Sequence, residues 1–400
     1  MKILYDLSAS QPGINEGLFH GGGEYAKTVF YKLCEMLPQK IILEVFYNPK
    51  KTIDESVLTI INEKGLGVNF CSSNTDISNL LLNNNYDVFY SALPYSYYNL
   101  SIPNKTKFIY TIHGLRSLEY PIDKYKLKYK KRSLKEKIKF ILFLFNPSFI
   151  KNIISNRDIS RLNKLFNLTN NQTIVTVSNH SKYVLSYFFP SLDVSKFRVL
   201  YSPLKFQEPI NCNEEQILKT YSLDPKKYIL LVGGNRSEKG AYRACRVLYN
   251  LINKNIRIPN DIKIIVIGVS LFKSYKKLTK NNHRFVFFGY IPSIDLEILY
   301  KNAQVFLYPT LNEGFGYPPL EAMRYETICA CSANSAVTEV CADSVLYFNP
   351  HDETEMSVRI LQSFDKDIRK IKKENLIERY KQIKARQEND LNLLVREILS

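Results

Sequence analysis

Apolar and polar residues alternate along the first half of the chain in a way that predicts strands separated by helices. Short runs rich in β-branched and aromatic residues recur, and stretches of helix length lie between them. Such alternation favours βαβ units and a parallel sheet covered on both faces. The predicted strands of this half are KILYDLSA, IILEVFYN, VNFCSS, YDVFYSA, KFIYTIHG, TIVTVS and FRVLYSP, within residues 2–203.

The same pattern starts again at Tyr228. The runs YILLVGG, IKIIVIG, RFVFFGY, AQVFLYPT, ICACSA and SVLYFNP form a second set of predicted strands. Several of them end in Gly, Pro or Ser, at the carboxyl side where open α/β sheets bind ligands. Between the sets, SPLKFQEPINCNEE at 202–215 has two prolines and no clear periodicity, which indicates a linker.

A chain of 400 residues exceeds one ordinary core, so two domains are expected. We predict an α/β fold of two Rossmann-like, doubly wound parallel-sheet domains, residues 1–203 and 204–375, facing a central cleft. The charged tail is helical in pattern, and residues 376–400 are expected to form a helix that packs back toward the first domain.

A large share of the net charge of +17 lies in one stretch. DKYKLKYKKRSLKEKIK, at 123–139, holds nine Lys or Arg against two acidic residues. The apolar run that follows, residues 140–154, is interrupted by Asn146, Pro147 and Lys151, too often for a bilayer span. Two interpretations stay open for residues 123–154: peripheral contact with an anionic membrane, or a surface helix packed on the first domain. Nucleic-acid binding is not expected, because no recognised module accompanies the basic run.

The remaining composition favours a cytoplasmic protein, and peripheral association with the cytoplasmic face of the inner membrane stays open. No uncharged apolar run of about 18 residues occurs, and MKILYDLSAS lacks the features of a secretory signal. Seven scattered cysteines are expected to be small buried hydrophobes. Cys329 and Cys331 have no second cysteine pair or histidine at ligand spacing, so no metal site is predicted there.

The most informative stretch is NEGFGYPPLEAMR, residues 312–324. A helix is expected to begin at its double proline, which places Glu313 in a loop and Glu321 in the first helical turn. Gly314 and Gly316 let the backbone approach a ligand. An ionised carboxylate only accepts hydrogen bonds and repels a phosphate, so carboxylates at such a site need hydroxyl groups as donors. A nucleotide sugar has hydroxyl groups on both sides of its diphosphate. The spacing alone would fit equally a helix-capping Glu321 and a solvated Glu313.

This segment resembles the signature of family-four retaining glycosyltransferases, the glycosyl transferases group 1, which have the GT-B fold. The resemblance covers most of the chain. Similar blocks are FFGYIPSIDLEILYKNAQVFLYPTLNEGFGYPPLEAM at 287–323, SANSAVTEVCADSVLYFNPHD at 332–352, VTVSNHSKYVLSYF at 175–188 and FRVLYSP at 197–203.

The resemblance also implies roles for two cations in LVGGNRSEKGAYRA, residues 231–244. Lys239 stands at a diphosphate-binding position of the family, and Arg236 lies two residues beyond the usual arginine. Fixed cations stabilise the charge of a departing nucleoside diphosphate. A solvated strand-to-helix turn is the alternative.

Two features near the first strands resemble the family as well. The glycine triplet of FHGGGEYAKTVFYKL opens a predicted helix, and in relatives such a loop faces the diphosphate and the acceptor. His113 ends a strand where relatives carry a histidine near the sugar or acceptor, although a lone histidine is commonly structural. The expected catalytic residues are Glu313, Arg236, Lys239 and His113. The expected donor-binding residues are Gly22, Gly23, Gly234, Asn235, Gly314, Phe315, Gly316, Tyr317 and Glu321.

The chain departs from the family pattern after Met323. Glu326 and Ile328 replace turn-forming residues, Thr338 stands where proline is common, and Ala342 where glycine is. These departures concern local loop shape and the fine specificity for the donor.

The implied function is transfer of a sugar, with retention, from a UDP- or GDP-linked donor to a saccharide or lipid-linked acceptor in bacterial surface polysaccharide synthesis. No cofactor or metal is expected, because the only D-x-D, at 365–367, lies in the charged tail. A sugar-nucleotide epimerase of the same fold and a non-catalytic partner subunit are the alternatives. The base, the sugar, the acceptor and the oligomeric state stay open.

Overall fold

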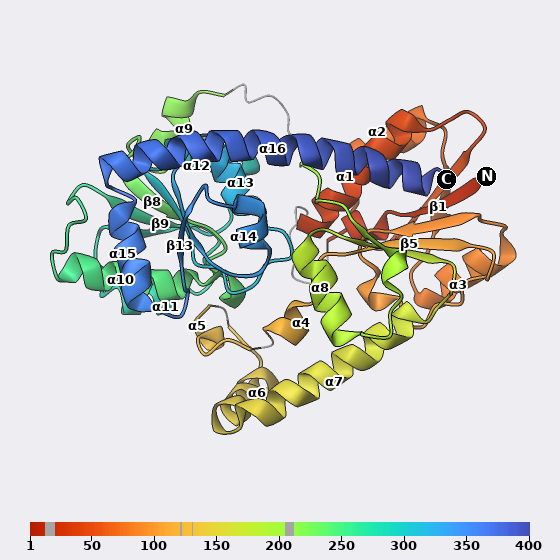
Figure 1. Cartoon of the computed structure of the whole chain (residues 1–400), viewed down its shortest axis with the longest axis horizontal. Coiled ribbons are helices and arrows are strands. Elements are labelled where there is room, and N and C mark those ends of the chain that lie inside the picture. Colours follow the sequence, from red (N-terminus) through yellow and green to blue (C-terminus); the bar gives the residue numbers. More distant parts are fainter. Residues whose placement is uncertain (13–20, 121, 130, 205–211) are drawn as a thin grey trace. The chain divides into compact units, whose positions relative to one another are not determined.

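The computed structural model describes residues 1–12, 21–120, 122–129, 131–204 and 212–400. The chain divides into two compact units. The first unit comprises Met1–Leu115, Asn156–Glu208 and Lys384–Ser400, and the second comprises Arg116–Ser155 and Pro209–Ile383. Each unit is built on its own parallel sheet with helices on its faces (Figure 1).

The first unit has a parallel sheet with the order β3-β2-β1-β4-β5-β6-β7. Its strands are β1 (Lys2–Asp6), β2 (Ile42–Tyr47), β3 (Gly67–Phe70), β4 (Val88–Ser91), β5 (Lys107–Ile112), β6 (Gln172–Thr176) and β7 (Phe197–Val199). Every residue of β4 and β6 is buried, as expected for strands covered on both faces. The helices of this unit include α1 (Gly21–Met36), α2 (Glu55–Glu63), α3 (Asn74–Asn83) and α8 (Asn179–Phe188).

The second unit has a parallel sheet with the order β10-β9-β8-β11-β12-β13. Numbered from its own first strand, this is the 3-2-1-4-5-6 order of the Rossmann fold. Its strands are β8 (Tyr228–Leu231), β9 (Lys263–Val266), β10 (Phe285–Phe287), β11 (Val305–Tyr308), β12 (Cys329–Ser332) and β13 (Leu346–Phe348). Its helices include α9 (Glu214–Thr220), α10 (Ala241–Asn253), α11 (Phe272–Leu278), α12 (Ser293–Asn302), α13 (Tyr317–Met323), α14 (Ser335–Cys341) and α15 (Glu353–Gln362).

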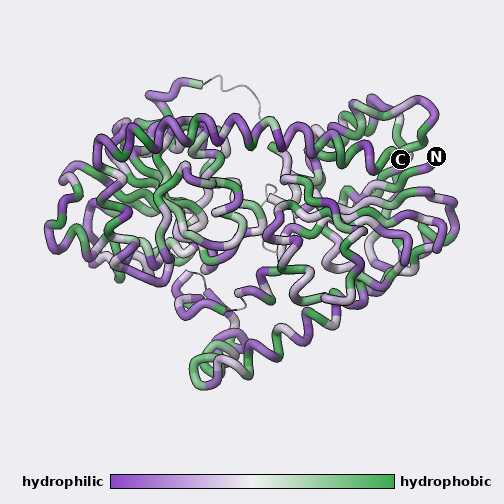
Figure 2. Tube along the Cα trace, viewed as in Figure 1, coloured by the Kyte–Doolittle hydropathy of each residue, from purple (hydrophilic) through white to green (hydrophobic). Residues whose placement is uncertain are grey.

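The strand pattern of the sequence is confirmed throughout the described residues. Each of the thirteen strands lies within or overlaps one predicted apolar run. Figure 2 shows these strands as hydrophobic segments in the interior of each unit, and the helices around them are mostly polar on their outer side. The prediction of two Rossmann-like parallel-sheet domains, the architecture of the GT-B fold, is therefore confirmed. Part of the expected linker, residues 205–211, lies outside the described residues.

The basic segment differs from its expected place. We expected residues 123–154 to belong to the first domain, within residues 1–203, but residues 116–155 group with the second unit. The segment contains α4 (Arg116–Glu119), α5 (Lys126–Tyr129), α6 (Leu134–Phe145) and the start of α7 (Pro147–Phe166). The physical reason is burial: Tyr129 is fully buried within the apolar core of the second unit.

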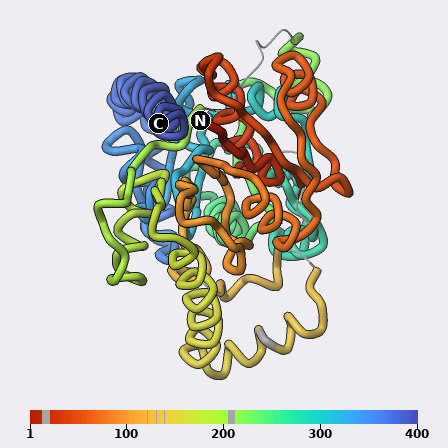
Figure 3. The backbone as a smooth tube through the Cα atoms, turned by 90° about the vertical axis from the view of Figure 1, so that its right-hand side faces the viewer, coloured from red at the N-terminus to blue at the C-terminus, as the bar shows by residue number. Residues whose placement is uncertain are grey.

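The tail forms one long helix, α16 (Lys366–Ile398), which begins ten residues before the expected boundary at 376. Figure 3 shows this helix nearly end-on. Its last part groups with the first unit. There Asp390 accepts the backbone N–H of Tyr201 at 2.8 Å, and the Gln387 amide donates to the carbonyl of Ser202 at 2.5 Å.

Candidate functional site

The candidate site lies at the carboxyl edge of the second sheet, after the adjacent strands β8 and β11. Here the strand order reverses, which is where open α/β sheets bind ligands. The turn after β8 contains the short helix η4 (Ser237–Lys239), and the loop after β11 contains Glu313.

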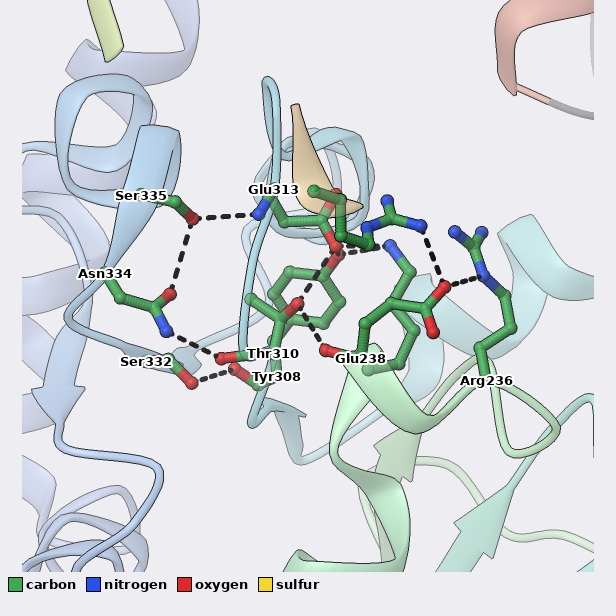
Figure 4. Close-up of polar contacts among 10 residues, drawn as sticks. Arg236, Glu238, Tyr308, Thr310, Glu313, Ser332, Asn334 and Ser335 are labelled. Carbon is green, nitrogen blue, oxygen red and sulfur yellow. Dashed lines mark hydrogen bonds and ion pairs between the residues drawn. The ribbon is translucent and has the colours of Figure 1, made fainter. Parts of the chain in front are cut away.

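Lys239 and Glu313 meet at this edge and form a buried ion pair. The Lys239 Nζ lies 2.5 Å from Glu313 Oε1. The Tyr308 hydroxyl accepts from the same ammonium at 2.7 Å and donates to Oε1 at 2.7 Å. The Thr310 hydroxyl lies 3.0 Å from Oε1. Figure 4 shows the Glu313 carboxylate among these groups.

The electrostatics keep this carboxylate ionised. Burial raises the pKa of Glu313, but the Lys239 and Arg116 charges and the bonds from Lys239 and Tyr308 outweigh it, so the pKa lies below its ordinary value. Burial and the Glu313 charge raise the pKa of Tyr308 well above its ordinary value. The Glu313 carboxylate is therefore ionised and the Tyr308 phenol neutral at neutral pH, whereas burial lowers the pKa of Lys239 even though the Glu313 charge opposes that shift.

The glycines of the β8 turn allow the chain to wrap closely around Lys239. Gly233 has φ +74°, and a Cβ there would lie 2.7 Å from the Lys239 Cγ. Gly240 has φ +70°, and a Cβ there would lie 1.9 Å from the carbonyl oxygen of Pro309. Both positions therefore require glycine. Because of this fit, η4 packs directly against the end of β11.

Two segments are joined to the β11 loop by hydrogen bonds. The carbonyl of Glu238 accepts from the Leu311 N–H at 2.7 Å. At the start of α14, the Ser335 hydroxyl accepts the Glu313 N–H at 2.9 Å, and the amide of the N-cap residue Asn334 donates to the Thr310 carbonyl at 3.1 Å (Figure 4). These bonds fix the backbone that carries Glu313.

Arg236 forms an ion pair at the exposed rim of the site. Its Nε donates to Glu238 Oε1 at 2.7 Å, and Arg116 Nη1 donates to the same oxygen at 2.9 Å. Burial alone would raise the pKa of Glu238. The charges of Arg236 and Arg116 outweigh this effect and lower the pKa to about 2. The expected diphosphate cations Arg236 and Lys239 thus both lie in the β8 turn, each with a carboxylate partner.

The prediction for Glu321 needs one correction. Helix α13 begins at Tyr317, so Glu321 is its fifth residue and the first turn holds no acidic residue. The reason is that Gly316, with φ +112°, caps the helix, so that the helix begins one residue before the prolines. The Glu321 charge, after burial, raises the pKa of the neighbouring Tyr300.

The other predicted donor-binding residues of the second unit differ in exposure. Asn235 is exposed in the β8 turn, whereas Phe315 is buried and packs edge-on against Tyr317 with ring centroids 5.3 Å apart. Gly234 is buried, and a Cβ there would lie 2.6 Å from Val269 Cγ2. Its small size is therefore accounted for by packing. Gly314 lies partly buried beside Glu313.

The remaining predicted residues belong to the first unit. Gly22 and Gly23 lie in the first turn of α1, and a Cβ on Gly22 would lie 2.8 Å from Leu93 Cδ1. His113 follows β5, its ring packs edge-on against Tyr25 at 4.6 Å, and its Nε2 lies 3.0 Å from the Ala92 carbonyl oxygen. These contacts hold the imidazole within the first unit.

Five residues of the site were not predicted from the sequence: Arg116, Glu238, Tyr308, Thr310 and Ser335. The one local signal in the sequence was Glu238, directly before Lys239, because an acidic residue in a basic turn suggests an ion pair. Arg116 had no such signal, since it lies 122 positions from Glu238. In the described part of the chain, no group of three His, Cys, Asp or Glu side chains is placed to hold a metal ion.

Comparison with known proteins places this site in a family context. Residues 213–383 match the family model of the glycosyl transferases group 1. The chain is 42% identical over 81 residues to O-antigen chain mannosyltransferase B of Escherichia coli, which is 20% of this chain and 21% of that protein. It is 28% identical over 185 residues to the O-antigen chain mannosyltransferase RfbU of Salmonella typhimurium, 45% of this chain and 47% of that protein. These matches span about a fifth and about half of the two relatives.

A solved structure shows the same fold over the whole chain. The glycosyltransferase from Rickettsia africae superposes with a TM-score of 0.65 at 15% identity, covering 100% of this chain and 98% of that one. The fold, the family match and the order of the motifs agree. Residues 213–383 are therefore a glycosyl transferases group 1 domain, and the resemblance noted from the sequence is confirmed.

Proposed function

We propose that the protein is a glycosyltransferase that moves a sugar from a nucleoside-diphosphate sugar to a saccharide or lipid-linked saccharide, with retention of configuration. The observation that carries this proposal is the buried Lys239–Glu313 pair, at the strand-order reversal of a group 1 domain. A fixed ammonium there suits the phosphate that departs, and a fixed carboxylate suits sugar hydroxyls.

The site suggests a division of labour among its charged groups. Arg236 and Lys239 bind the diphosphate, and Glu321 binds the ribose diol. Among the described residues, the side-chain bonds to Glu313 all go to Oε1. Its other oxygen, Oε2, is the acceptor that we assign to the hydroxyls of the donor sugar.

The sugar that we propose first is mannose, in the synthesis of a surface polysaccharide such as an O-antigen. The support is that the two relatives described above are mannosyltransferases of O-antigen chains. We propose that transfer needs no metal ion, because Arg236 and Lys239 supply the positive charge that neutralises the departing diphosphate.

The test is a donor screen followed by two variants. Melting temperature is measured with UDP, GDP, UDP-glucose and GDP-mannose, since a ligand that binds only the folded state raises it. Glu321→Ala is expected to weaken nucleotide binding about tenfold. Glu313→Gln, which keeps a polar partner for Lys239, is expected to leave binding nearly unchanged and to reduce transfer by at least about 100-fold.

Glu215→Ala, at an exposed position in α9, serves as the matched control. Equal losses of binding and transfer in both variants would refute the division of labour. Transfer that stops when EDTA is added and returns with Mg²⁺ would refute metal independence.

We also propose that α6 and the start of α7 contact the surface of an anionic bilayer, which would bring the protein to lipid-linked acceptors. Between residues 134 and 153 the exposed large hydrophobics are Leu134, Ile138, Ile141, Leu142, Leu144, Phe145, Phe149 and Ile153. Phe145 is 85% exposed and Phe149 is 59% exposed. Exposed lysines, including Lys135 and Lys151, lie among them. Apolar side chains flanked by cations suit the headgroup region of an anionic leaflet.

In the described residues no helix combines the length and the apolar content that crossing a membrane requires. The expected contact is therefore peripheral. Sedimentation with vesicles of phosphatidylcholine alone, or with about 30% phosphatidylglycerol, tests it. The chain should bind only the anionic vesicles, and Phe145→Ser with Phe149→Ser should abolish binding. Tyr290→Ser, at a similarly exposed aromatic residue, should bind as the unchanged protein does. Absence of vesicle binding would overturn the proposal.

A further inference from the structure

Arg116 is a cation of the second unit that no motif of the sequence indicates. It is the first residue of α4, and its Nη1 lies 2.9 Å from Glu238 Oε1. Arg236 binds the same oxygen with its Nε at 2.7 Å. Two guanidinium groups therefore share one carboxylate oxygen at the rim of the site. The side chains of Arg116 and Arg236 are 40% and 46% exposed, so a ligand can reach both.

The position of Arg116 is held by contacts that follow it in the chain. Asp123 forms a buried ion pair with Arg243 of α10. The carbonyl of Tyr129 accepts from the Ser270 hydroxyl at 3.1 Å, and the Tyr129 side chain lies within the core of the second unit. The stretch that begins at Arg116 is therefore anchored to the same unit that carries Glu238.

The charges of the cluster do not balance internally. Arg116, Arg236 and Lys239 bring three positive charges, while Glu238 and Glu313 bring two negative ones. The Nε of Arg116 is buried and has no hydrogen-bond partner among the described residues. A carboxylate offers only two oxygens, whereas a diphosphate offers several and more negative charge. The cluster therefore carries a net charge of +1, which favours an anionic ligand.

We propose that Arg116 is a third diphosphate-binding cation, and that Glu238 neutralises Arg116 and Arg236 until the phosphate oxygens of the ligand take its place. The proposal rests on the nucleoside-diphosphate binding proposed above. A planar guanidinium suits phosphate oxygens because it can donate two parallel hydrogen bonds. When a diphosphate binds, its oxygens accept from the two arginines beside Glu238.

Two variants of opposite expected effect test the two halves of the proposal. Arg116→Gln should weaken the binding of UDP or GDP by about tenfold to 100-fold, because a charge-assisted hydrogen bond is lost. Uridine and guanosine, which carry no phosphate, should bind unchanged. Glu238→Gln should tighten diphosphate binding several-fold, because it removes a negative charge beside the ligand.

Binding is measured by titration calorimetry with UDP, GDP, uridine and guanosine, at two salt concentrations. Arg157→Gln, an exposed arginine of α7, is the matched control. Arg116→Lys keeps the charge and serves if Arg116→Gln fails to fold. Unchanged diphosphate affinity in Arg116→Gln would overturn the role of Arg116, and weaker affinity in Glu238→Gln would overturn the role of Glu238. If the unchanged protein binds neither UDP nor GDP, the proposed function itself fails.

Discussion

At the scale of single residues, backbone conformation decides which positions of the second unit need glycine. Gly240 and Gly316 meet this need, with φ +70° and +112°. Among the positions with positive φ that carry side chains are Glu326 at +57° and Ala342 at +46°. Both are positions where the chain departs from the family pattern. The departures therefore store local strain, because a Cβ is disfavoured in these conformations.

Ala342→Gly is expected to raise the free energy of unfolding by about 1 kcal/mol. Ala342 combines φ +46° with ψ −129°, a region that glycine adopts without a steric penalty. The relief of strain exceeds the entropy that glycine adds to the unfolded chain. Denaturant unfolding measures the change. Ala244→Gly, inside α10, should lower the free energy by at least about 1 kcal/mol. A loss of stability in Ala342→Gly would contradict the strain.

At the scale of elements, the stretch from Arg116 to Tyr129 shows how one anchored segment can supply a site residue. Its anchors are the Asp123–Arg243 ion pair and the aromatic packing of Tyr129, whose ring lies 6.1 Å from that of Tyr242. Both charged side chains are buried. A buried pair is costly to break, because the partner that remains is left charged and desolvated.

Arg243→Met is expected to lower the free energy of unfolding by about 3 kcal/mol or more, since it leaves the Asp123 carboxylate buried without its partner. Hydrogen exchange should also rise in the described residues between 116 and 129, because the segment loses an anchor. Arg157→Met removes an exposed arginine and should change the free energy by less than about 0.5 kcal/mol. Similar losses in the two variants would show that the segment is not held by the buried pair.

At the scale of the whole molecule, the net charge of +17 means that the positive side chains repel one another, and the carboxylates reduce this repulsion. Several have pKa values below the ordinary range because cations or hydrogen-bond donors hold them, including Glu44, Asp54, Glu238 and Glu313. Asp6 is the opposite case, since full burial raises its pKa despite bonds from Ser8, Ser91 and Tyr97. A fall in pH should therefore destabilise the fold mainly by protonating the carboxylates with lowered pKa values, such as Glu238 and Glu313.

The expected pH dependence follows from Glu238. Its folded-state pKa, about 2, lies below its ordinary value of 4.5, so the unfolded chain takes up the proton first as the pH falls. The contribution of Glu238 to stability is thus complete above about pH 5 and is lost progressively toward pH 2. The difference in the free energy of unfolding between the unchanged protein and Glu238→Gln should shrink over this window. A difference that stays constant from pH 7 to about pH 2 would contradict the charge pairing. Glu215→Gln, at an exposed position, is the control.

Residue patterns in the sequence predicted much of this molecule. The thirteen strands follow from apolar runs, because burial on both faces of a parallel sheet demands continuous apolar stretches. Lys239 and Glu313 were each singled out, but their ion pair was not, since 74 positions separate them. The start of α13 was placed one residue late, because glycine at 316 rather than proline sets the helix boundary.

The sequence by itself determined the order of strands and helices, the two Rossmann-like domains and the family of residues 213–383, because these depend on local periodicity and short motifs. Only the tertiary structure decided that residues 116–155 group with the second unit, that Glu238 joins Arg116 to Arg236, and that Glu313 is buried against Lys239. Such contacts depend on which strand ends meet at a sheet edge, and no local pattern encodes that meeting.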